Sequence, residues 1–298
     1  MIKSNALDFM QKLDFPIDAQ SELLSKLDII LQEPKYADAF LNAIDYYDSE
    51  NFDFSKMLEN IKSLAKSADI CEYTAYMLLF ICLAPKLHIR YKQNSLSDAV
   101  FYDTMADLRY KLEECRLVHG KVGTFVAWWY KGFFEMKIFA IGRLQFEINY
   151  TWFDCDVNGL HIPKGTKVLS VHIPRTGTRL EHSLVVDSYQ KASEFFKDEF
   201  DEIIFICNSW LLYPWNRQVL KEGSNLAAFY DDYTIVNSGN YANYNEVWRL
   251  FDCLYDGNPD ILPNDTSLRR AYIERIKSGE PTGYGIGVIL FDEFNKSR

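Results

Sequence analysis

"VLSVHIPRTGTRLEHSLVVDSYQKASEFF", residues 168–196, contains in order the signatures of a strand, a short loop and a helix. The first residues are mostly β-branched or apolar and end at Pro174, which cannot continue the hydrogen-bonding ladder of a strand. A polar loop with Gly177 follows, and the apolar spacing after it predicts a helix at about 181–198. The N-terminus of such a helix offers unpaired N–H groups and a positive dipole end, which suit a pyrophosphate.

The same loop has a plainer interpretation, because any connection from a strand to a helix needs polar residues and often a glycine. Arg175 and Arg179 favour the phosphate site, since either guanidinium can donate charge-assisted hydrogen bonds to a pyrophosphate. Thr178 or Ser183 is expected to cap the helix. The loop alone does not choose between the two interpretations.

Composition narrows the class of protein. The chain has 298 residues, of which 48% are hydrophobic and 25% charged, as in a globular protein with one large domain or two ordinary ones. Its formal net charge of −10 argues against nucleic acid as a partner, because affinity for nucleic acid comes mainly from Lys and Arg.

Cysteine spacing and apolar runs exclude further classes. The six cysteines are scattered without a CxxC pair, so neither a zinc site nor a disulfide framework is expected, and no metal is predicted. The N-terminus lacks the apolar stretch of a signal peptide. The longest apolar run, at about 73–84, is too short to span the hydrocarbon of a bilayer, which is ~30 Å thick. We therefore expect a cytoplasmic protein that does not act at a membrane.

The first part of the chain, to about residue 130, has helical periodicity throughout. One clear apolar stripe, with spacings of three and four, consists of Phe54, Met57, Leu58, Ile61 and Leu64. Pro16, Pro34 and Pro85 fall between such stripes, where helices are expected to stop. The pattern predicts six or seven helices and no strand.

After about residue 135 the period changes to that of mixed strands and helices. Asn158-Gly159 predicts a hairpin turn, "EIIFICNSWLLYP" begins as a buried strand, and "YGIGVILFD" predicts a last strand whose glycines admit a close backbone approach. Helices are expected at 245–253 and 266–277. The predicted fold class is therefore α+β with two domains: an all-α domain at 1–130 and a mixed α/β domain at 131–298.

Four segments of the second domain carry a family resemblance: "GRLQFE" (142–147), "VLSVHIPRTGTRLEHSL" (168–184), "CNSWLLYP" (207–214) and "GSNLAAF" (223–229). They are similar to bacterial acyltransferase-domain proteins, in which a helical N-terminal domain precedes a domain like that of Gcn5-related N-acetyltransferases (GNAT). The order of elements from residue 137 onward also resembles the GNAT order. The resemblance implies transfer of an acyl group from acyl-CoA to an amine or another small-molecule acceptor.

The resemblance also implies roles for particular residues. The CoA pyrophosphate would lie on the loop after the fourth strand, which corresponds here to Ile173, Arg175, Thr176, Gly177, Thr178 and Arg179. Near the end of the preceding strand, His172 would lie close to the thioester carbonyl. Glu147 would act as the base for the amine, and Tyr230 would be the acid for the leaving thiolate.

The chain departs from the usual GNAT cradle, Gln/Arg-x-x-Gly-x-Gly/Ala. Its glycine follows Arg175 by only two places, and no second glycine or alanine follows. An alternative is therefore a GNAT-shaped protein without catalytic activity that binds a small ligand. A third hypothesis, a glycoside-active protein, rests on the paired carboxylates Asp154/Asp156 and Asp231/Asp232, which turn residues explain more simply.

Overall fold

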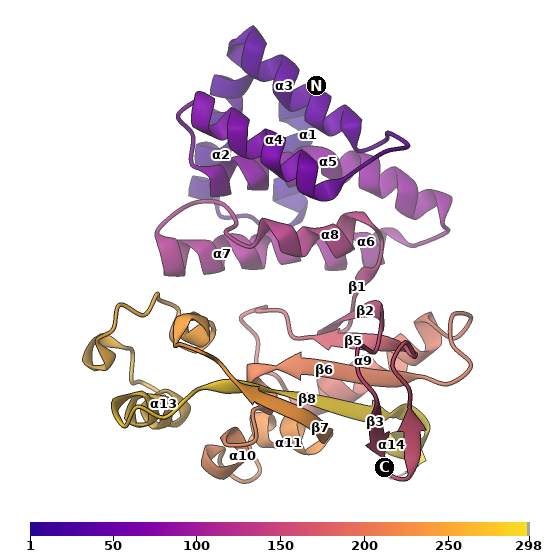
Figure 1. The fold of residues 1–298 in the computed structure, drawn as a ribbon. Helices are drawn as coiled ribbons and strands as arrows, with labels where there is room; N and C mark the ends of the chain where they lie inside the picture. The colour runs from indigo at the N-terminus through magenta and orange to yellow at the C-terminus, as the bar shows by residue number, and fades with distance from the viewer. Residues whose placement is uncertain (297–298) are drawn as a thin grey trace. The chain divides into compact units, whose positions relative to one another are not determined.

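A computed structural model describes residues 1–296 and divides the chain into two compact units, Met1–Lys137 and Ile138–Arg298. The division falls seven residues after the domain boundary expected from the sequence. Helices make up the first unit, and a mixed sheet with helices makes up the second (Figure 1). The predicted fold class is thus confirmed, and each unit is described by itself below.

The first unit contains only helices within the described residues. They are α1 (Ile2–Lys12), α2 (Ile17–Gln32), α3 (Pro34–Tyr46), α4 (Phe54–Ser67), α5 (Glu72–Gln93), α6 (Asp98–Met105), α7 (Asp107–His119), the 3₁₀ helix η1 (Ala127–Tyr130) and α8 (Lys131–Phe134). The predicted stripe on α4 is buried through Phe54, Met57, Ile61 and Leu64. Asp53 caps this helix by accepting from the backbone N–H groups of the two residues that follow Phe54.

Pro85 does not end a helix, contrary to the prediction. It lies inside α5, the longest helix, whose central residues are buried in an unbroken run from Met77 to Ala84. Burial on all sides compensates for the hydrogen bond that a proline removes, because each buried apolar side chain contributes ~1.5–3 kcal/mol. None of the helices in the described chain combines the length and apolar composition that a membrane crossing requires.

The second unit contains all eight strands of the described chain. They are β1 (Ile138–Ile141), β2 (Leu144–Tyr150), β3 (Cys155–Val157), β4 (Leu160–Ile162), β5 (Lys167–His172), β6 (Ile204–Ser209), β7 (Thr234–Asn240) and β8 (Gly283–Leu290). The helices of this unit are α9 (His182–Phe195), η2 (Trp210–Leu212), α10 (Asn216–Val219), α11 (Asn225–Asp231), η3 (Asn245–Val247), α12 (Trp248–Phe251), η4 (Pro259–Ile261), α13 (Ser267–Lys277) and α14 (Phe291–Lys296).

Six of these strands form one sheet in the order β1-β2-β5-β6-β8-β7, and β3 and β4 form a separate hairpin. All neighbours in the large sheet are antiparallel except β5 and β6, which are parallel and joined through α9. Parallel neighbours need such a crossover, whereas antiparallel ones can be joined by a turn.

The two faces of the sheet are covered differently. On one face, Tyr189 of α9 packs against Phe146 and Phe205. On the other face, the β3–β4 hairpin packs with Val168 and Ile206 in one buried cluster. Because side chains alternate along a strand, Ser170 and His172 lie on the hairpin face together with Val168. Glu147 pairs with Ser170 in the β2–β5 register and therefore lies on that face too.

Strand β8 carries glycine at positions 283, 285 and 287, and the backbone approaches closely there, as the sequence predicted. A Cβ atom on Gly285 would lie 1.9 Å from the carbonyl oxygen of Leu212 in η2. At Gly287 it would lie 2.6 Å from the Cβ of Tyr233. No side chain fits at either position, so the strand needs glycine there for close packing.

The predicted helices near 245–253 and 266–277 are present, and they belong to a long segment between β7 and β8. This segment, residues 241–282, has its own buried cluster, which includes Phe251, Leu262, Tyr272 and Ile276. A turn of two residues would suffice to join antiparallel neighbours. The segment is therefore an additional element on the sheet.

We predict that residues 138–298 fold without the helical unit. The large sheet and its two covering layers are complete within this fragment. The fragment should keep the strand signal in circular dichroism and show one cooperative thermal transition. A fragment that gives only a random-coil spectrum would contradict the assignment of 138–298 as a domain.

Candidate functional site

Glu147 and His172 form a pair on the hairpin face of the sheet. The His172 Nε2 atom lies 3.0 Å from the Glu147 Oε2 atom, across neighbouring strands β2 and β5. The side chains are 27% and 23% exposed, so both remain accessible to a ligand. A carboxylate in this position orients the imidazole ring. Glu147 and His172, both selected from the sequence, therefore lie together.

The ladder between β5 and β6, beside this pair, is short. Their register joins Leu169 with Phe205 and Ser170 with Ile206, whereas β2 and β5 are paired along six positions. The last of these register pairs on β5 lies two residues before His172.

Arg143, directly before β2, holds the loop that follows β5. Its guanidinium donates to the carbonyl oxygens of Pro174 at 3.0 Å, Thr178 at 3.1 Å and Arg179 at 3.4 Å. These three hydrogen bonds fix the loop against β2, while Glu147 of the same strand lies beside His172.

The loop is a compact turn. Gly177 has a φ of +79°, in the left-handed region that favours glycine, and the space beside it is open. The hydroxyls of Thr176 and Thr178 lie 2.7 Å apart. Helix α9 begins at His182 with Glu181 as its N-cap and without a side-chain capping bond, so neither Thr178 nor Ser183 is the cap. Thr178 belongs to the turn and lies four residues before the first residue of the helix, which is too early for a cap.

Three N–H groups of the loop face away from Arg143. In a trans peptide the N–H points opposite to the carbonyl of the same unit, and the chain has no cis peptide bond. The three carbonyls bound to Arg143 therefore direct the N–H groups of Arg175, Arg179 and Leu180 to the other side. Within residues 1–296 these three N–H groups have no protein acceptor. Such an array of oriented N–H groups can bind an anion.

The two arginines of the loop have different environments. Arg175 forms an ion pair with Asp252, which also pairs with Arg269 at 2.6 Å. Arg179 is exposed, and no carboxylate of the described chain lies within ion-pair distance of it. Arg179 is therefore the cation of the loop that remains available to a bound anion. The sequence could not rank the two, because Asp252 lies 77 residues from Arg175.

Tyr230 lies on α11 and is half-buried, and no hydrogen bond joins it to the Glu147–His172 pair within the described residues. Burial, and to a smaller extent Asp231, raises the pKa of Tyr230, which keeps its hydroxyl protonated at neutral pH.

The sequence analysis missed a second His–carboxylate pair: His182 Nε2 lies 2.9 Å from both oxygens of Asp232. The sequence signal for this second pair was His182 itself, a histidine shortly after the loop.

The paired carboxylates of the glycosidase hypothesis each have another partner. Asp231 binds Arg217 at 2.6 Å, and Asp156 binds His161 at 2.8 Å. Asp154 accepts from the N–H of Lys164, as expected of a turn residue. Among residues 1–296, no group of three or more His, Cys, Asp or Glu side chains is placed to hold a metal ion.

Two family matches together cover most of the chain. Residues 138–289 match the GNAT-like C-terminal domain, and residues 4–136 match the N-acyltransferase N-terminal domain. Both parts of the resemblance noted in the sequence are confirmed. Comparison with curated proteins gives no match.

Solved acyltransferase structures share the fold. One, in complex with decanoyl-CoA and teicoplanin, is 20% identical with a TM-score of 0.74, and the match covers 95% of this chain and 87% of that one. A mutant acyltransferase in complex with octanoyl-CoA is 18% identical with the same TM-score, covering 96% and 88%. A third, in complex with decanoyl-CoA, has a TM-score of 0.65 at 19% identity and covers 96% and 99%.

Cys207, on β6, should not react as a nucleophile. Burial raises the pKa of its thiol to about 12, so the thiolate fraction at pH 8 is ~10⁻⁴. We expect iodoacetamide at pH 8 to modify the half-exposed Cys71 and Cys253 first and Cys207 only after unfolding, as mapped by mass spectrometry. Modification of Cys207 in the folded protein at the rate of Cys71 would contradict this placement.

Proposed function

The chain belongs to the family of proteins with a GNAT-like C-terminal domain, and we propose that it transfers an acyl group from acyl-CoA to a small-molecule acceptor. The observation that carries the proposal is the loop of residues 174–180. Arg143 binds three carbonyls of this loop, and three N–H groups of the loop therefore face away from Arg143. Arg179 adds a positive charge that has no ion-pair partner in the described chain. These features fit the pyrophosphate of CoA. The solved neighbours with acyl-CoA bound have the same fold.

The short ladder between β5 and β6 supports a path for the rest of the cofactor. The loop leads into α9, which covers one face of the sheet, while Glu147 and His172 lie on the other face. A pantetheine arm that starts at the loop can run along the C-terminal end of β5, beyond the last register pair with β6. It then brings the thioester next to His172.

The reaction that this arrangement supports is direct transfer to an amine. The amine nitrogen attacks the thioester carbonyl carbon, and its proton passes to the Glu147–His172 pair. The C–S bond breaks, and the thiolate of CoA takes a proton, for which Tyr230 is the proposed donor. The products are an amide and CoA with a free thiol. The Glu147–His172 pair returns its proton to solvent, and the Tyr230 phenolate takes a proton from solvent.

One observation favours the alternative of a ligand-binding protein without catalysis. The Thr176–Thr178 contact involves position 178, where the usual cradle, counted from Arg175, has its first glycine. Calorimetry with CoA, together with an assay of thiol release from an acyl-CoA over a panel of amines, separates the two functions. Binding without thiol release for any amine would count against catalysis, and absence of CoA binding at millimolar concentration would exclude the transferase and favour the alternative.

Glu147→Gln should lower turnover by ~10²–10⁴-fold, because it keeps the hydrogen bond to His172 but removes the carboxylate that shares the proton. The affinity for CoA should be nearly unchanged, since Glu147 does not contact the loop. The matched control is Glu199→Gln, which removes only a surface ion pair with Lys167. Turnover of Glu147→Gln equal to that of the wild type would refute this assignment.

Arg179→Ala should weaken the binding of CoA by ~1.5 kcal/mol, about tenfold, which is the lower end for a hydrogen bond to a charged group. Arg175→Ala should cost less, because Arg175 already has Asp252 as its partner. Lys191→Ala, more than two turns further along α9, is the control. Pantetheine, which lacks the pyrophosphate, should bind wild type and Arg179→Ala equally in calorimetry. An equal loss for pantetheine would mean that Arg179 acts through the structure of the loop.

A further inference from the structure

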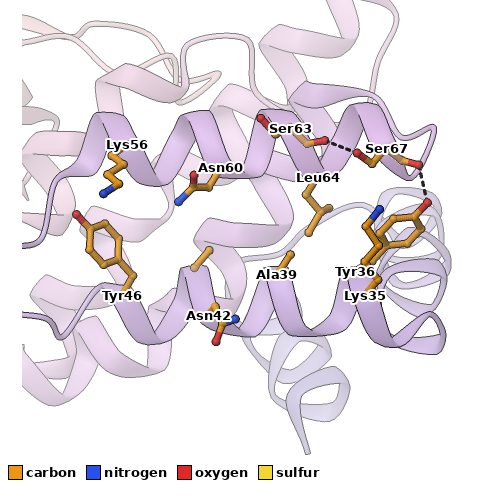
Figure 2. Close-up of a pocket in the computed structure, with 11 residues that line it drawn as sticks. Lys35, Tyr36, Ala39, Asn42, Tyr46, Lys56, Asn60, Ser63, Leu64 and Ser67 are labelled. Carbon is orange, nitrogen blue, oxygen red and sulfur yellow. Dashed lines mark hydrogen bonds between the residues drawn. The ribbon is translucent and has the colours of Figure 1, made fainter.

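A groove of about 560 Å³ runs between α3 and α4 of the helical unit, separate from every residue discussed above as part of the acyl-transfer site. Figure 2 shows that side chains of both helices point into it along its length. Its floor is made by small and apolar side chains, among them Ala39, Ala43 and Leu64. The volume lies within the range of sites that hold ligands in proteins, ~300–1,000 Å³.

Hydrogen bonds close both ends of the groove. At one end, the Tyr36 hydroxyl donates to the carbonyl of Ser67 at 2.6 Å and joins the two helices. At the other end, the Tyr46 hydroxyl donates to the carbonyl of Asn51 at 2.8 Å and accepts from the N–H of Asp53 at 3.1 Å, which fixes the connection between the helices. The groove is therefore preformed, and a ligand would not need to order it.

The charge of the groove is opposite to that of the protein. Lys35 lies at one end and Lys56 at the other, and no carboxylate lines the space between them. Within the described chain neither lysine has an ion pair; Lys56 lies 5.8 Å from the ring centroid of Tyr46. A protein with 42 acidic and 32 basic residues thus keeps two unneutralised cations in one groove. This favours a ligand with negative charge at two separated points.

The middle of the groove offers an amide. Asn60 points from α4 toward α3, whereas Asn42 points away from α4 (Figure 2), and the Asn60 amide binds no other group of the described chain. An asparagine amide both donates and accepts, so it can pair with the N–H and C=O of one peptide unit. Eleven residue steps separate Lys35 from Tyr46 and Lys56 from Ser67, a length of about 16 Å along a helix. An extended chain of about five residues has that length.

We propose that this groove binds an extended acidic peptide segment of a partner protein. Asn60 holds the peptide backbone, and Lys35 and Lys56 pair with carboxylates four residues apart. The apolar floor accepts the side chains between these carboxylates. Neither the acyl donor nor the acceptor of the proposed reaction takes part, so the groove serves recruitment rather than chemistry.

The test uses the full chain and a defined probe, the acetylated and amidated pentapeptide Glu-Thr-Val-Thr-Glu, whose β-branched centre favours the extended form. Its titration should shift backbone amide signals of α3 and α4 in ¹H–¹⁵N NMR spectra. The matching peptide with Gln in place of both Glu residues should bind at least tenfold more weakly. Binding should also weaken as salt is added, because exposed charges are screened.

Lys35→Gln and Lys56→Gln should each weaken the binding of this peptide by ~2–5-fold, as exposed ion pairs do. Lys66→Gln is the matched control, since Lys66 is exposed on α4 but does not line the groove. Equal melting temperatures of the variants would verify that all of them are folded. The proposal is overturned if the acidic peptide shifts no signal of α3 or α4, if the Gln peptide binds equally well, or if inorganic phosphate displaces the peptide at equal concentration.

Discussion

Strands β5 and β6 run parallel, yet only two residue pairs join them, Leu169 with Phe205 and Ser170 with Ile206. Both strands are otherwise held by antiparallel neighbours, β2 on one side and β8 on the other. Because these outer ladders are long, the sheet stays continuous although its central ladder is short. The proposed path of the cofactor depends on this short ladder.

Arg143 holds the loop that follows β5. One guanidinium satisfies three carbonyls that would otherwise point outward, and the peptide units then expose their N–H groups on the opposite side. The usual glycine-rich cradle reaches this orientation through backbone freedom. Here a side chain from the neighbouring strand imposes it on a loop that has only one glycine, Gly177. The departure from the family pattern is therefore compatible with the proposed anion site.

The sequence predicted those features that depend on local spacing. The stripe from Phe54 to Leu64, the helix after the loop and the close approach at the glycines of β8 all follow from periodicity or residue type. The pairing of Glu147 with His172 was within reach because both had been selected for chemistry. Spacing failed where a partner comes from a distant segment: Arg143 turns to the loop and Arg175 to Asp252. Pro85 was misjudged because helix α5 is held by burial on all sides rather than by its own propensity.

The alternating glycines of β8 also affect the unfolded chain. Glycine has the largest conformational freedom of all residues, and each one in a strand costs ~0.5–1 kcal/mol relative to alanine when the strand is ordered. Gly283, Gly285 and Gly287 place this cost in the strand that pairs with both β6 and β7. The strand therefore has little tendency to form by itself, and its order comes from its two neighbours and from the η2 backbone that packs on it. Half of the sheet thus gains its stability only when sequence-distant segments assemble together.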